Sequence, residues 1–106
     1  MCFNDYYMNI SDKNIEQIKQ ICKEYRVKKF SVFGSVLTEN FSSDSDIDFV
    51  VDFDEKDPFK YTDLYFQLKE ELEQILKRQI DLIEERGIKN PFFRKEIDES
   101  KVVIYG

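Results

Sequence analysis

The segment from Ile47 to Phe53 constrains the fold of this chain more than any other part of the sequence. It reads Ile-Asp-Phe-Val-Val-Asp-Phe, with an apolar residue at every second position. Side chains alternate between the two faces of a strand, so this pattern predicts a strand with one face in a hydrophobic core. Asp48 and Asp52 fall on the opposite face, where carboxylates can meet water or a ligand.

The acidic residues of the chain gather around this strand. The net charge is −6 over 106 residues, and residues 44–57 alone hold seven acids against one lysine. The rest of the chain has 15 acids and 15 bases and is balanced. Such a chain lacks the broad basic surface that nucleic-acid binding requires, so no direct nucleic-acid binding is expected. The acidic block is instead a candidate cation site.

Further helices and strands are predicted on both sides of this strand. Together they predict an α/β (α+β) fold, a small mixed β-sheet flanked by helices. The predicted elements are a helix over residues 11–25, a strand over 30–33 that ends at Gly34, the strand over 47–53, a long amphipathic helix opened by Asp57 and Pro58, a strand over 79–84, a short helix opened by Asn90 and Pro91, and a strand over 102–105.

Three carboxylates and one turn form a candidate phosphate-and-metal site. Asp46 and Asp48 are two residues apart on one strand, so both project from the same face. Two like charges held together are tolerated when a divalent cation lies between them, and Mg²⁺ prefers such oxygen ligands together with substrate phosphates. Gly34 and Ser35 end the preceding strand, where a glycine lets the backbone approach a phosphate. Asp81 lies in an otherwise apolar strand, and a metal shared with the other two carboxylates would give it a partner.

The motif resembles a known family. Gly34 and Ser35, ten further residues, and then Asp46-Ile47-Asp48 resemble the GSX10DXD signature of the DNA polymerase β-like nucleotidyltransferases. The short chain and its later Ile-Asp-Leu-Ile-Glu segment resemble the minimal branch, the MntA-type antitoxins that pair with HEPN toxins. The resemblance covers about residues 28–105 and implies a polymerase β-like nucleotidyltransferase fold.

The resemblance also implies a reaction. Asp46 and Asp48 would bind two Mg²⁺ ions, and Asp81 would complete the metal site and help to activate the acceptor hydroxyl. A tyrosine of a partner HEPN toxin would attack the α-phosphorus of ATP, and pyrophosphate would leave. The turn lacks the arginine of many relatives, and its substitute is left open among Lys28, Lys29, Arg78 and Arg94. The implied nucleotide-binding residues are Gly34, Ser35 and Ser45.

We expect a single nucleotidyltransferase domain over residues 1–106, with a lead-in and helix over 1–27 and the catalytic core over 28–105. No apolar run is long enough to span a membrane, and the N-terminus lacks the features of a signal peptide. Two cysteines and no histidine exclude a disulfide framework, a classical zinc site and a histidine-based triad. A cytoplasmic location is the expectation.

Several alternatives stay open. The protein could be a non-catalytic antitoxin that neutralises its toxin by binding, or a nucleotidyltransferase acting on a small molecule. Residues 44–55 imitate a calcium-binding EF-hand loop, but Phe49 stands where that loop needs glycine, so we interpret the match as coincidence. Of the other acids, Asp52 is expected to support the metal ligands and Glu55 to lie in a solvated turn. Phe92 and Phe93 are expected in the core, and the alternative is that one of the two rings lines a base pocket.

Overall fold

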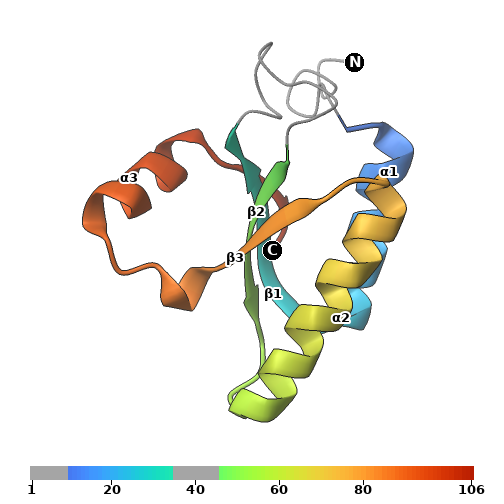
Figure 1. The fold of residues 1–106 in the computed structure, drawn as a ribbon, viewed down its shortest axis with the longest axis horizontal. Coiled ribbons are helices and arrows are strands. Elements are labelled where there is room, and N and C mark those ends of the chain that lie inside the picture. The colour runs from blue at the N-terminus through green and yellow to red at the C-terminus, as the bar shows by residue number, and fades with distance from the viewer. Residues whose placement is uncertain (1–9, 35–45) are drawn as a thin grey trace.

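The computed structural model describes residues 10–34 and 46–106, and its elements follow the predicted order (Figure 1). Two of the predicted nucleotide-binding residues, Ser35 and Ser45, lie outside the described residues. The elements are α1 (Asp12–Glu24), β1 (Val27–Phe33), β2 (Ile47–Phe53), α2 (Pro58–Leu76), β3 (Ile80–Glu84), the 3₁₀ helix η3 (Glu85–Gly87), α3 (Pro91–Ser100) and β4 (Val102–Tyr105).

The four strands form a mixed sheet in the order β3-β2-β1-β4. β1 runs antiparallel to both β2 and β4, whereas β2 and β3 are parallel and are joined through α2. β1 begins at Val27, three residues earlier than predicted. The start of β1 was not predicted because Lys28 and Lys29 are both exposed and interrupt the alternation of buried and exposed residues. The pairing of β1 with β2 is irregular at this point.

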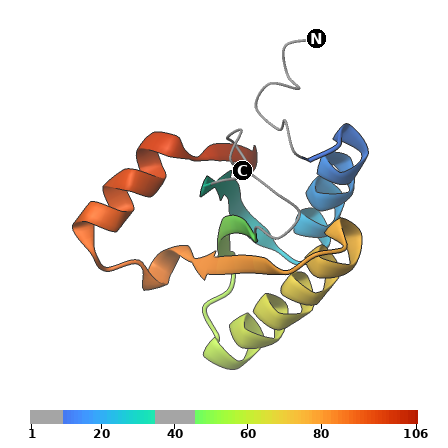
Figure 2. The ribbon, with the colours of Figure 1, turned by 45° about the horizontal axis from the view of Figure 1, so that its top comes forward.

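One face of the sheet packs against α1 and α2, and α3 lies on the other side (Figures 1 and 2). The predicted alternation of β2 is confirmed, since its four core positions are 0–2% exposed. The rings of Phe30 and Phe49 stack at 4.8 Å between centroids and join β1 to β2 inside this core. α1 contributes a buried stripe of Ile15, Ile18, Ile21 and Cys22.

The acidic turn after β2 starts α2 as predicted. The Asp57 carboxylate accepts hydrogen bonds from the backbone N–H groups of Phe59 and Lys60, and Pro58 occupies the first turn. The helix ends at Lys77, whose φ of 56° is left-handed. This long crossover places β3 beside β2 in the parallel direction.

The prediction that Phe92 and Phe93 lie in the core is wrong. Phe92 is 82% exposed and Phe93 is 37% exposed, although the Phe93 ring makes an edge contact with Phe33 at 6.3 Å. α3 has ten residues and buries only Ile97, because it covers the less packed side of the sheet. Among the described helices, none is long and apolar enough to cross a membrane.

Candidate active site

Asp48 lies at the centre of the predicted site. It projects from β2 on the face opposite to the α1–α2 core, with Phe33 of β1 across from it on one side and Asp81 of β3 on the other. The parallel register pairs Asp48 directly with Asp81. Two of the three predicted carboxylates, 33 positions apart in the chain, are therefore neighbours.

The electrostatics agree with this placement. Burial raises the pKa of Asp48, and the negative charges of Asp81 and Asp46 raise it further. Asp48 is half-buried, whereas Asp46 and Asp81 are exposed. Without a cation, the carboxylates of Asp81 and Asp46 thus disfavour ionisation of Asp48.

The environment of Asp81 differs from the expectation. We argued that an aspartate in an apolar strand needs a partner, but β3 is an edge strand of the sheet and Asp81 is exposed to water. The exposure of Asp81 depends on the order of the strands, which a single sequence does not reveal. Solvent therefore satisfies Asp81, and its value to the site comes from its register with Asp48.

Gly34 brings the backbone against Asp48. It follows β1 with φ of +84°, a left-handed value that favours glycine, and a Cβ atom there would lie 2.5 Å from Oδ2 of Asp48. A side chain at this position would collide with the carboxylate. The turn that is expected to hold phosphate therefore begins in direct contact with the central acid.

The donor set fits a cation that is completed by substrate. Within residues 10–34 and 46–106, no three Asp, Glu, Cys or His side chains are gathered closely enough to enclose a metal ion. Mg²⁺ is commonly held by one or two carboxylates together with substrate phosphates and water, rather than by a closed protein cage. Asp48 and its two neighbours, beside an open glycine turn, match that mode of binding.

Asp52 does not support the metal ligands, contrary to the expectation. Its carboxylate forms an ion pair with Arg86 at 2.9 Å, and the same guanidinium donates to the carbonyl oxygens of Phe53 and Glu55. Arg86 also lies over the ring of Tyr61, with 4.1 Å from its Cζ to the ring centroid. These contacts tie η3 to the turn after β2.

Glu55 is likewise not a solvated turn residue. Its side chain is 11% exposed, pairs with Arg26 at 2.9 Å, and accepts hydrogen bonds from the backbone N–H groups of Lys56 and Asp57. Phe49 is buried in β2, so this part of the acidic block is strand and the EF-hand match is a coincidence, as interpreted. Three acids of the block, Asp52, Glu55 and the helix cap Asp57, thus have structural roles.

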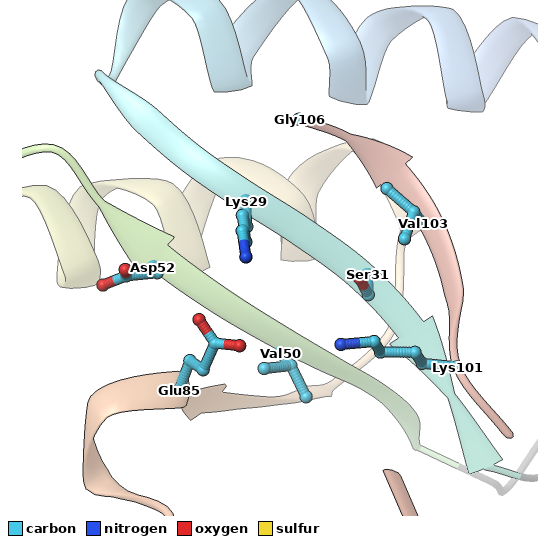
Figure 3. A pocket seen from close by; sticks show the side chains of 8 residues that line it. All are labelled: Lys29, Ser31, Val50, Asp52, Glu85, Lys101, Val103 and Gly106. Atoms are coloured by element: carbon cyan, nitrogen blue, oxygen red, sulfur yellow. The ribbon is translucent and has the colours of Figure 1, made fainter. Parts of the chain in front are cut away.

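Arg94, a candidate to replace the arginine missing from the glycine turn, forms other contacts, and Lys101 is a further basic residue on this face of the sheet. Arg94 donates to the side chain and the backbone carbonyl of Glu85. Lys101, which sequence reasoning missed, lies with Lys29 along a cavity on the Asp48 face of the sheet (Figure 3). Only the antiparallel pairing of β4 with β1 brings these two lysines together, and no short motif records it.

The chain is similar to known proteins in sequence and in fold. The family model of polymerase beta nucleotidyltransferases matches residues 16–106. The chain is 34% identical over 100 residues to "Putative protein adenylyltransferase MJ1379" of Methanocaldococcus jannaschii, which covers 87% of this chain and 99% of that protein.

Solved structures share the fold. A structure described as a "putative minimal nucleotidyltransferase" superposes with a TM-score of 0.72 and 28% identity, over 85% of this chain and 88% of the other. A chain from the structure of a tri-AMPylated Shewanella oneidensis HEPN toxin in complex with MNT antitoxin has a TM-score of 0.61 and 18% identity, covering 89% and 71%. At that identity the second likeness concerns the fold alone.

A family model that spans most of the chain, a relative matched over nearly its whole length and a carboxylate pair beside a glycine turn all point the same way. The chain belongs to the polymerase beta nucleotidyltransferase family and is a nucleotidyltransferase.

Proposed function

We propose that the protein is a Mg²⁺-dependent protein adenylyltransferase that transfers AMP from ATP to a tyrosine of a partner HEPN toxin, and so acts as an antitoxin in the cytoplasm. The observation that carries the proposal is the register that pairs Asp48 with Asp81 beside Gly34. Nucleotidyl transfer needs carboxylates and a phosphate-binding turn in this proximity.

Each part of the site has a distinct role in this proposal. Asp46 and Asp48 hold the cation with the nucleotide phosphates, and Gly34, with Ser35 and Ser45, binds the triphosphate. Asp81 faces the acceptor and orients its hydroxyl. The oxygen–phosphorus bond to the acceptor forms as the bond to pyrophosphate breaks. Bound Mg²⁺, as two ions, would neutralise the charge that develops on the phosphates.

The protein partner is inferred from relatives. One relative is named a protein adenylyltransferase, and the fold also occurs in a structure that contains an AMPylated HEPN toxin with its MNT antitoxin. The described part of this chain is one small sheet with three α-helices and one 3₁₀ helix, and it shows no separate acceptor-binding domain. The two names describe transfer to a protein, so we infer an acceptor on a partner protein rather than a small molecule.

Labelled ATP tests the reaction directly. The protein is incubated with Mg²⁺, α-labelled ATP and the protein encoded by the neighbouring gene, and we expect label on a tyrosine of that protein. Asp48→Asn should abolish labelling, whereas Asp54→Asn, at an exposed position outside the site, should leave it intact. If Asp48→Asn labels as well as wild type, the assignment of the site is wrong.

Neutralisation in cells separates catalysis from binding. If the Asp46→Asn/Asp48→Asn variant still protects cells from the toxin, the protein acts by contact and the enzymatic proposal fails. Nucleotide binding is checked by thermal unfolding. Mg²⁺ with ATP at about 100 times the dissociation constant should stabilise wild type by about 2.7 kcal/mol, and this double variant much less.

A further inference from the structure

A cavity opens on the same face of the sheet as Asp48. Its volume is about 150 Å³, and its floor is made by Ser31 of β1 and Val50 of β2, each 5% exposed. Val50 is the next residue after Asp48 on that face of β2, about 7 Å further along the strand. The cavity therefore begins one step from the central carboxylate. Its lining residues are Lys29, Ser31, Val50, Asp52, Glu85, Lys101, Val103 and Gly106.

We call this the open-face cavity, and two of its hydrogen-bond donors, on Lys29 and Ser31, have no partner among the described residues. Among residues 10–34 and 46–106, neither the Lys29 ammonium nor the Ser31 hydroxyl makes a side-chain hydrogen bond or ion pair. Ser31 is the one polar residue of the described chain that is buried, and its side chain lines the cavity, where its hydroxyl can donate to a bound molecule. Such a pair points to a ligand that supplies acceptor atoms.

The two acceptor side chains of the cavity, Asp52 and Glu85, are each held by an ion pair with an arginine. Arg86 holds the carboxylate of Asp52, and Arg94 holds that of Glu85. The side chains of Lys29, Lys101 and Glu85 point toward one another across the cavity (Figure 3). The cavity thus presents donors and acceptors together, which matches a heterocycle carrying both ring nitrogens and an amino group, and does not match a simple anion or an apolar ring.

The geometry of nucleotidyl transfer indicates where the nucleoside lies relative to the α-phosphate. Asp81 of β3 and Asp48 of β2 are in register, and Gly34, which follows β1, lies against Asp48, so the three residues form a row across the sheet. In-line displacement puts the acceptor and the leaving pyrophosphate at the two ends of that row. The nucleoside therefore leaves the α-phosphate across the row. Along β2 one direction leads to Asp46, which the proposed function assigns to the cation, and the other leads to Val50 and the cavity.

We propose that the open-face cavity binds the base of the nucleoside triphosphate and selects a base with an exocyclic amino group, such as adenine. The inference rests on the proposed function. Lys29 and Ser31 donate to ring nitrogens, and Asp52 and Glu85 accept from the amino group. The volume suits the six-membered ring of the base, because a cavity of this size accommodates benzene.

Calorimetry with two probes tests the proposal. Binding of a non-hydrolysable ATP analogue and of inorganic tripolyphosphate, which has no base, is measured with Mg²⁺ for wild type and Lys29→Ala/Ser31→Ala. We expect the double variant to weaken binding of the ATP analogue at least about tenfold and to leave tripolyphosphate unchanged. Lys23→Ala is the matched control, since Lys23 is exposed on α1 and does not line the cavity.

A filling variant covers the case in which the double variant does not fold. Val103 lines the cavity from the edge strand β4 and is 52% exposed, so Val103→Trp should narrow the cavity without burying a new group in the core. It should also weaken the ATP analogue while sparing tripolyphosphate. Wild type should bind the ATP analogue more tightly than the UTP analogue, and the variants should lose this preference.

The remaining outcomes would overturn the inference in distinguishable ways. Equal weakening of both probes would make the cavity an anion site. Unchanged nucleotide binding with poorer labelling of the acceptor would make it an acceptor site. If wild type itself binds neither probe, the proposed function fails together with the inference.

Discussion

Asp48 and Asp81 face each other in register across the parallel strands β2 and β3, and this pairing is repulsive when no cation is present. The pKa of Asp48 is raised, so in the folded state its neutral form is favoured more than in the unfolded state. The neutral carboxyl contributes stability below the unfolded pKa of about 3.8, and this contribution is lost as the pH rises through the folded pKa.

Asp48→Asn should therefore stabilise the metal-free protein at pH 7 while abolishing transfer. The gain should be at most about 1 kcal/mol, because water screens a half-buried carboxylate, and it should vanish below pH 3.8. Urea unfolding at both pH values measures it. Asp54→Asn is the control, and a loss of stability at pH 7 in the Asp48 variant would refute the argument.

Gly34→Ala should damage the site more than the fold. The new methyl group would lie 2.5 Å from Oδ2 of Asp48, and the φ of +84° is strained for alanine. We expect a destabilisation of about 1–2 kcal/mol, since the residue ends a strand, and a larger loss of affinity for Mg²⁺ with ATP. Calorimetry and urea unfolding separate the two effects. Gly87→Ala, where a Cβ meets only atoms at 3.8 Å, should change neither by much.

Arg86→Ala should destabilise the protein by about 2 kcal/mol. The guanidinium makes one ion pair, two hydrogen bonds to backbone carbonyls and a contact over the Tyr61 ring, and its removal leaves those acceptors unpaired. Arg26→Ala removes a single ion pair of a well-exposed arginine and should cost about 0.5 kcal/mol. Similar losses for the two variants in chemical denaturation would show that Arg86 is not a structural tie.

Two tyrosines of α2 should respond in opposite ways. The Tyr61 hydroxyl is enclosed without a hydrogen-bond partner among the described residues, whereas Tyr65 donates to the carbonyl of Leu82. Tyr65→Phe should cost about 1 kcal/mol, and Tyr61→Phe should be neutral or stabilising by a similar amount. Unfolding free energies at pH 7 measure both.

The stability conferred by Tyr61 should also depend on pH. Burial, followed by the charge of Glu84, raises the pKa of Tyr61 to about 12 from an ordinary value of 10.0. The neutral hydroxyl thus contributes stability that is present below pH 10 and is lost as the pH rises toward 12. The advantage of Tyr61→Phe over wild type should grow between these values. A difference that stays constant with pH would contradict the raised pKa.

Local patterns predict much of this fold. Alternation identifies β2, the capping residues identify the starts of α2 and α3, and the glycine turn with its two aspartates points to the site. What the sequence does not reveal is pairing at a distance. The edge position of β3, the capture of Asp52 by Arg86 and the convergence of Lys29 with Lys101 all depend on strand order. Phe92 was misplaced because an apolar residue of a short helix does not disclose how much of that helix is covered.

The parallel pairing of β2 with β3 also determines when the protein can begin to act. Parallel neighbours cannot be joined by a hairpin, so the 19-residue α2 must be made and must cross the sheet before Asp81 reaches Asp48. Contacts of such sequence separation form late, after long-range closure. A chain still emerging from the ribosome therefore carries Gly34 and Asp48 without Asp81, and its candidate site stays incomplete until synthesis has passed β3.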